Sequence, residues 1–222
     1  MTVDLTEIFA KYERLAAEAD ALFERVRSQH TDCVTCASGC SDCCHALFDL
    51  GLVEAMYLNR RFAEAFGFGA ERSAILERAD AADRHAVRLK RRLYKESLGG
   101  RESAELLAEV ARERIRCPLL GDDDTCAMYA HRPITCRLYG IPTAIGGVAH
   151  TCGRTGFALG GKYPTVALDK IHERLAGLSH EILVAVQSRY RELDQVYVPV
   201  SMALITKYDN TYLGVGPVKK ES

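Results

Sequence analysis

The chain has 222 residues, of which 27% are charged, and a formal net charge of −1 at pH 7. It is long enough to bury a core without metals or disulfides, and its near-neutral charge gives no general attraction to nucleic acid, so no nucleic-acid partner is expected. No apolar run approaches the roughly 18 residues of a membrane span and residues 1–30 lack a signal-peptide core, which predicts a cytoplasmic protein without a membrane anchor.

The N-terminal segment predicts a long amphipathic helix over residues 4–28. Its apolar side chains recur every three or four residues, at Leu5, Ile8, Tyr12, Leu15, Ala19, Leu22 and Val26. The residues that follow, 28–41, are small, polar and rich in cysteine. That composition predicts a loop.

Three helices are expected in the middle of the chain, over residues 50–66, 71–98 and 102–115. The second of these has the clearest stripe, with Ile75, Ala79, Ala82, Ala86, Leu89 and Leu93 on one face, and Gly99-Gly100 ends it. The third has Leu107, Ala111 and Ile115 on one side.

Helical periodicity disappears between residues 117 and 161. Gly146-Gly147 between two short apolar runs predicts a hairpin, whose two-residue turn would set Cys152 opposite Ile141 and near Cys136. A last long helix is expected over 164–190, with Pro164 in its first turn. Residues 196–206 fit either a short strand or a short helix, and the tail from Pro217 is expected to be disordered.

These elements predict a mainly α fold, in one domain over residues 1–222. A helical body carries a cysteine-rich irregular region, about residues 33–152, with one small β-hairpin. The helices over 4–28 and 164–190 flank that region.

Nine cysteines are present, in two groups. In a reducing compartment cysteines are more often metal ligands or catalytic thiols than disulfides, and an odd number cannot pair completely. Buried thiols that act as small hydrophobes explain single cysteines but not five within twelve residues. The first group is Cys33, Cys36, Cys40, Cys43 and Cys44, and the second is Cys117, Cys126, Cys136 and Cys152.

Thiolate ligands select zinc, copper(I) or iron–sulfur centres. Zinc sites are often built from pairs of cysteines two residues apart, and Cys40 and Cys43 form such a pair. Iron–sulfur clusters accept mixed spacing and a cysteine followed by proline, as at Cys117-Pro118. The pattern favours an iron–sulfur cluster, with [4Fe–4S] as the expected type and zinc as the alternative. Residues 36–43 also have radical S-adenosylmethionine spacing, but the chain lacks the strand–helix repeats of those enzymes.

The ordered set of cysteines resembles the YkgJ-like cysteine-cluster family, which is named for zinc or iron chelation. The likeness lies in Cys36-x3-Cys40-x2-Cys43-Cys44, Cys117-Pro118-Leu119-Leu120, Cys126-Ala127-Met128-Tyr129, Arg132-Pro133-x2-Cys136-Arg137 and Cys152. The resemblance implies that the metal ligands are Cys36, Cys40, Cys43, Cys44, Cys117, Cys126, Cys136 and Cys152. The family often has two residues between its first two cysteines, so either Cys33 or Cys36 can be the first ligand.

Arg132 and Arg137 flank Cys136 and are candidate cofactor-binding residues. A guanidinium near thiolates lowers the pKa of the thiols and offsets the negative charge of a cluster. The alternative is that both arginines pair with the acids at residues 122–124. His45, His131 and His150 also lie near cysteines, but hydrogen-bonded histidines without a metal are expected there.

Three functions remain open. The first is a metal- or cluster-binding protein in redox chemistry, electron transfer or metal handling. The second is a cluster-dependent modifying enzyme, and the third is a structural-zinc scaffold for a protein partner. The metal ion or cluster is the one partner that the sequence indicates.

Overall fold

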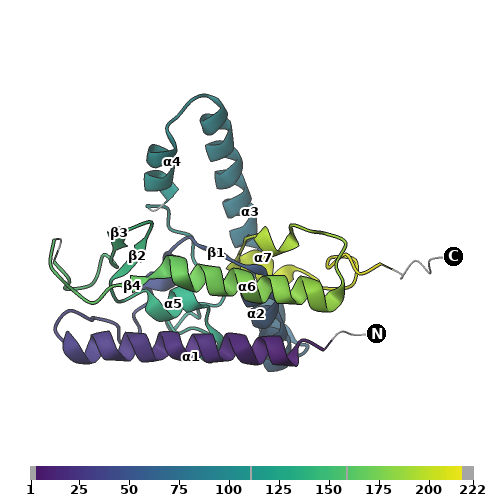
Figure 1. The fold of residues 1–222 in the computed structure, drawn as a ribbon, viewed down its shortest axis with the longest axis horizontal. Helices are drawn as coiled ribbons and strands as arrows, with labels where there is room; N and C mark the ends of the chain where they lie inside the picture. The colour runs from purple at the N-terminus through teal and green to yellow at the C-terminus, as the bar shows by residue number, and fades with distance from the viewer. Residues whose placement is uncertain (1–3, 111, 159, 217–222) are drawn as a thin grey trace.

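The computed structural model describes residues 4–110, 112–158 and 160–216. It confirms a mostly helical protein with small sheets (Figure 1). The helices are α1 (Thr6–Gln29), α2 (Leu52–Ala65), α3 (Ala70–Leu98), α4 (Ser103–Val110), α5 (Ile134–Leu138), α6 (Leu168–Val186) and α7 (Val200–Ile205). The 3₁₀-helical turns are η1 (Asp42–His45), η2 (Tyr129–His131) and η3 (Leu193–Gln195). The predicted disordered tail lies outside the described residues.

Helix α1 follows its predicted stripe closely. Every stripe residue is buried except Leu22, which is partly buried against the same core. The stripe packs against α2, α5 and α6, and α1 and α6 run side by side (Figure 1). Their shared core includes Leu15 and Ile182, both almost fully buried.

A second core lies on the other side of α2. There α2 and α3 both face α7, and Phe62 and Ala79 are 0% exposed. Residues 52–58 of α2 are therefore all buried, because this helix stands between the two cores. Within the part of the chain that is described, no helix is both long and apolar enough to cross a membrane.

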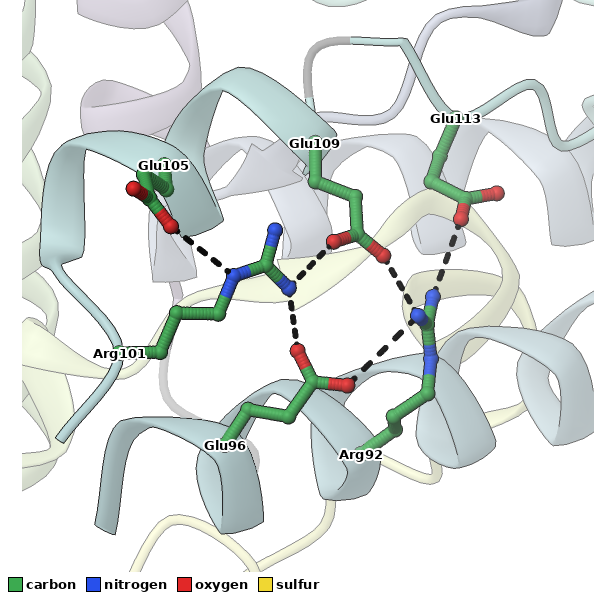
Figure 2. A network of polar contacts seen from close by, with 6 residues as sticks. All are labelled: Arg92, Glu96, Arg101, Glu105, Glu109 and Glu113. Carbon is green, nitrogen blue, oxygen red and sulfur yellow. Dashed lines mark hydrogen bonds and ion pairs between the residues drawn. The ribbon is translucent and has the colours of Figure 1, made fainter. Parts of the chain in front are cut away.

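The upper half of α3 and the short α4 project from the body as an arm (Figure 1). Two arginines and four glutamates cross-link the arm (Figure 2). Arg92 lies 2.6 Å from Glu109 and 3.2 Å from Glu113, and Arg101 lies 2.6 Å from the other Glu109 oxygen. Both arginines also pair with Glu96, and Arg101 pairs with Glu105. Charge pairing thus holds the two helices of the arm together.

Two small sheets complete the fold. The predicted hairpin forms from β2 (Thr143–Ile145) and β3 (Val148–His150), with Gly146 and Gly147 at φ +57° and +77°. Its pairing of Ile145 with Val148 is the predicted register. β4 (Val166–Ala167) adds to β2 in parallel, while β1 (Asp49–Leu50) pairs with β5 (Val198–Pro199). Residues 196–206 therefore contain both predicted alternatives, a strand and then α7.

Two helices are shorter than predicted. α4 ends at Val110 rather than at residue 115. The Ile115 N–H donates to the His45 carbonyl (3.1 Å) and so takes no part in the helix. Ala111 lies outside the described residues. α6 begins at Leu168 rather than at Pro164, because the residues before it form β4. At the other end, Gln187 adopts a left-handed conformation and ends α6 before residue 190.

Candidate metal centre

The first cysteine group lies in the chain that leaves α1. The Cys40 N–H donates to the Ala37 carbonyl at 3.0 Å and closes a turn. Gly39 has φ +82° in this turn, a conformation that glycine adopts without steric cost. Cys43 and Cys44 follow in η1, where the Cys44 N–H donates to the Ser41 carbonyl at 2.9 Å. The turn and η1 bend this segment back on itself.

Cys117 and Cys126 lie at the base of a tight loop. Leu120 and Cys126 form an antiparallel bridge, and the Ala127 N–H donates to the Leu119 carbonyl at 2.8 Å. The Asp123 carboxylate accepts from the Thr125 N–H (3.1 Å), which is turn chemistry. The loop therefore brings Cys126 back beside Cys117.

A backbone hydrogen bond joins the two cysteine groups directly. The Cys117 N–H donates to the Cys44 carbonyl at 2.7 Å. Next to it, Ala46 and Arg114 form an antiparallel bridge. The fold thus brings the chain around Cys44 against the chain around Cys117.

Cys136 is carried by α5, whose N-cap is Pro133. The buried Glu54 of α2 fixes the start of this helix, because its Oε1 accepts from the Ile134 N–H (3.0 Å) and from the Tyr12 hydroxyl (3.2 Å). Burial raises the pKa of Cys136 well above its usual value, and the neighbouring thiols Cys43, Cys117 and Cys126 raise it further. Cys136 therefore interacts electrostatically with thiols of both cysteine groups.

Cys152 is tied to the first group through Asp42. Its Sγ donates to Asp42 Oδ2 at 3.2 Å, and Arg114 binds the other Asp42 oxygen at 2.6 Å. Burial raises the pKa of Cys152 to about 11, and the thiol that adds to this effect is Cys36. Burial also opposes ionisation of Asp42, but the bonds from Cys152 and Arg114 outweigh it and lower the Asp42 pKa. Asp42 thus links the end of the hairpin to η1.

The sulfurs of Cys43 and Cys44 lie 4.0 Å apart. The hydrogen bond from the Cys44 thiol lowers the pKa of Cys43 to about 7, and the same bond raises that of Cys44. Burial raises the pKa of Cys117 to about 12. Cys43 is therefore the thiol most easily ionised at neutral pH among these three.

The cysteine thiols are the donors that a soft metal prefers, although their sulfur atoms do not converge on one point. Within the described residues, no three His, Cys, Asp or Glu side chains converge at ion-binding distance. The thiols nevertheless come from both groups and are mostly buried or half-buried, which is the chemistry that thiophilic metals select. Metal binding would require the sulfurs to move closer and to lose their protons.

Cys33 is partly buried against the first core, which contains the stripe of α1. Its carbonyl accepts from the Gly156 N–H at 2.8 Å. A Cβ added at Gly156 would lie 3.1 Å from the Cys33 Cα, so this close approach favours glycine. Cys33 behaves here as a small apolar residue.

Arg132 and Arg137 both pair with Asp20 of α1, not with the acids at residues 122–124. Arg137 is 8% exposed and also donates to the carbonyls of Arg132 (2.9 Å) and Ala130 (2.7 Å). The Arg132 guanidinium lies 4.0 Å from the centre of the exposed Tyr129 ring. Arg137 therefore holds the backbone before α5.

Arg132 is the arginine whose charge reaches the thiols. Burial raises the pKa values of Cys36 and Cys126, and the positive charge of Arg132 acts in the opposite direction on both. Of the nearby histidines, His131 Nδ1 lies 3.1 Å from the Tyr57 hydroxyl and His45 Nδ1 lies 3.0 Å from the Ser41 carbonyl. These two histidines have ordinary hydrogen-bond partners, as expected.

The sequence reasoning missed three acids that position the site: Asp20, Asp42 and Glu54. Asp42 had one available signal, its place beside the Cys43-Cys44 pair. Glu54 had another, because an acid within the apolar run of residues 52–58 must find a buried partner. Asp20 lies among charged residues of α1 and gave no signal.

Comparison with known proteins gives one family match. A family model named CxxCxxCC and described as a "Putative zinc- or iron-chelating domain" matches residues 32–153, which contain all nine cysteines. No curated protein and no solved structure matches the chain. Since the matched range covers more than half of the 222 residues, this protein belongs to the CxxCxxCC family of zinc- or iron-chelating cysteine domains.

Proposed function

We propose that this protein holds an iron–sulfur centre of the [4Fe–4S] type and uses it in redox chemistry, electron transfer or metal handling. The proposed ligands come from the eight cysteines Cys36, Cys40, Cys43, Cys44, Cys117, Cys126, Cys136 and Cys152. The observation that carries the proposal is the 2.7 Å hydrogen bond between Cys117 N–H and the Cys44 carbonyl. It makes neighbours of two cysteine groups that are remote in the sequence.

The spacing of the cysteines supports a cluster over zinc. Among the eight proposed ligands, Cys40 and Cys43 are the one pair with the two-residue spacing typical of structural zinc sites, whereas at least eight residues separate Cys117, Cys126 and Cys136 from one another. Sulfurs around one tetrahedral zinc would lie about 3.8 Å apart, given a zinc–sulfur bond of about 2.3 Å. A cluster of several iron atoms accepts thiolates over a wider volume, and it would supply one-electron transfer when bound.

Cys36 is the better candidate for the first ligand than Cys33. The Cys36 thiol interacts with Cys40, Cys43 and Cys152, whereas Cys33 packs against the α1 core. The family name gives two residues between its first cysteines, and this chain has three between Cys36 and Cys40. The turn at Gly39 accommodates the additional residue.

Arg132 and Arg137 have different proposed roles beside the centre. Arg132 would offset negative charge on the thiolates, because its charge already acts on Cys36 and Cys126. Arg137 would act through Arg132, since its side chain donates to the Arg132 carbonyl and shares Asp20 with it.

The experiment that tests the proposal is anaerobic purification followed by analysis of iron, zinc and acid-labile sulfide, with an absorption spectrum. We expect a brown protein that contains iron and sulfide and shows broad visible charge-transfer absorption. A colourless protein with stoichiometric zinc would contradict the proposal and favour the structural-zinc scaffold.

A further inference from the structure

The Cys36 sulfur lies directly against Gly140, the residue that follows the C-cap of α5. A Cβ added at Gly140 would overlap the Cys36 Sγ, at a distance that two non-bonded atoms cannot adopt. The same Cβ would lie 3.3 Å from Cε2 of Phe23, which belongs to α1. The sulfur therefore occupies the space that a side chain at position 140 would fill.

The backbone at Gly140 is held in place by the first core. Leu138 and Ile141, on either side of it, are 1% and 0% exposed and both belong to that core. The Ile141 N–H donates to the Leu138 carbonyl at 3.2 Å and closes the turn that contains Gly140. The φ of Gly140 is not in the left-handed region, so backbone conformation alone does not require glycine. The contact with the sulfur does.

The opposite partner, Cys36, is free to move. It is the one exposed cysteine of the nine. The Cys43 and Cys152 sulfurs take part in hydrogen bonds, whereas within the part of the chain that is described no hydrogen bond reaches the Cys36 sulfur. Burial nevertheless raises the pKa of the Cys36 thiol, and the thiols of Cys40 and Cys43 raise it further. Packing against Gly140 thus holds this sulfur near two other proposed ligands.

We propose that Gly140 is a positioning residue of the metal centre, because its lack of a side chain leaves the space in which the Cys36 sulfur approaches the other ligands. The inference rests on the proposed function, in which Cys36 is the first ligand. An alanine at position 140 would have the fixed turn on one side and an exposed cysteine side chain on the other. The cysteine would therefore move, and the centre would lose one ligand at little cost in folding stability.

The test measures how well the full-length protein retains its metal against EDTA in four forms: wild type, Gly140→Ala, Cys36→Ala and the double variant. We expect Gly140→Ala to weaken retention by about 10–100-fold, the range found for residues that orient metal ligands. Adding Gly140→Ala to Cys36→Ala should weaken it no further, because the sulfur that the alanine displaces is already absent. The midpoint of urea unfolding should stay the same in all four forms.

Gly153→Ala is the matched control. Gly153 is also next to a proposed ligand, Cys152, but a Cβ added there would have no neighbour within 4 Å. This variant should retain metal as well as the wild type does.

Two results would overturn the inference. One is unchanged retention in Gly140→Ala. The other is an equal further loss when Gly140→Ala is added to Cys36→Ala, since the alanine would then damage the end of α5 rather than displace Cys36. The wild type tests the proposed function separately: zinc in place of iron would contradict the iron–sulfur centre and leave the comparison of variants valid. A wild type without metal would contradict both.

Discussion

The helical body and the cysteine-bearing loops lie against each other but are stabilised in different ways. In the body, α1 buries a continuous apolar stripe against α2 and α6. In the loops, backbone bridges and side-chain carboxylates join the segments that carry the cysteines: Cys117 to Cys44, Asp42 to Cys152, and Glu54 to Ile134. The loops also bury single apolar side chains in the two cores, among them Leu119, Met128 and Ile141.

This difference determines which part of the fold a metal can stabilise. Burial of apolar surface stabilises α1 and α6 whether or not a metal is present. The cysteine region keeps several thiols buried in their protonated form, as the raised pKa values of Cys117 and Cys152 indicate. A metal that replaces those protons would add its binding free energy to the loops and little to the helices.

Metal removal should give the largest effect. Structural zinc contributes about 10–16 kcal/mol in small finger peptides, so loss of the metal should unfold residues 30–46 and 117–152, the short α5 included, while α1, α2, α3 and α6 persist. Hydrogen exchange measured by mass spectrometry on holo and chelator-treated protein checks this. Fast exchange confined to those two segments, with the circular dichroism nearly unchanged, is the expected result. If chelation leaves the protection of both segments unchanged, the loops do not depend on the metal more than the helical body does.

Truncation in the core should have the next largest effect. Leu15 is 2% exposed, so Leu15→Ala should lower the free energy of unfolding by about 2–5 kcal/mol. Leu98→Ala, at a side chain that is 71% exposed, is the matched control and should change it by less than about 0.5 kcal/mol. Urea unfolding measures both. Metal content should be the same in the two variants; a loss of metal in Leu15→Ala alone would show that body and loops are not separable.

The arm should be less sensitive. Arg92→Gln removes pairs to Glu109 and Glu113, which are partly exposed, and each such pair is worth about 0–1 kcal/mol. We expect faster hydrogen exchange in α4 with little loss of global stability, and a similar effect of high salt on the wild type. Arg88→Gln is the control, since Arg88 has no ion pair within the described residues. Equal exchange in both variants would mean that the network in Figure 2 does not hold α4.

The smallest effect concerns His131, beside Tyr57. Burial and the charge of Arg61 lower the pKa of folded His131 below its usual value of 6.5. As pH falls through 6.5, the unfolded chain binds a proton that the folded chain does not, so the free energy of unfolding should decrease down to the lower, folded pKa. Urea unfolding above and below pH 6.5 measures this decrease, and His131→Gln should reduce it. Superimposable profiles for variant and wild type would contradict the assignment.

Much of the helical body could be predicted because its apolar residues repeat with the helical period. The apolar stripes predicted the first and last residues of α1 and of α3 to within two residues. The hairpin was equally clear, since Gly146-Gly147 fits a turn with two positive φ values and thereby fixes the register.

Long-range pairing explains what could not be predicted. After α4, Arg114 pairs with Ala46 next to the Cys43-Cys44 pair, and Val166 pairs with β2. Neither pairing produces a pattern among neighbouring residues in the sequence. Sequence reasoning likewise proposed the cysteines as ligands from their pattern, but not Asp42 or Asp20, whose partners lie more than a hundred residues away in Cys152 and Arg137. The eight-cysteine ligand set itself stays a prediction.

The most direct test of the account is the metal content of three matched variants, Cys43→Ser, Cys136→Ser and Cys33→Ser, purified anaerobically. If one centre spans both cysteine groups, the first two variants should each lose most of the metal, and Cys33→Ser should keep it. Full metal in both Cys43→Ser and Cys136→Ser would contradict the account, as would an equal loss in all three.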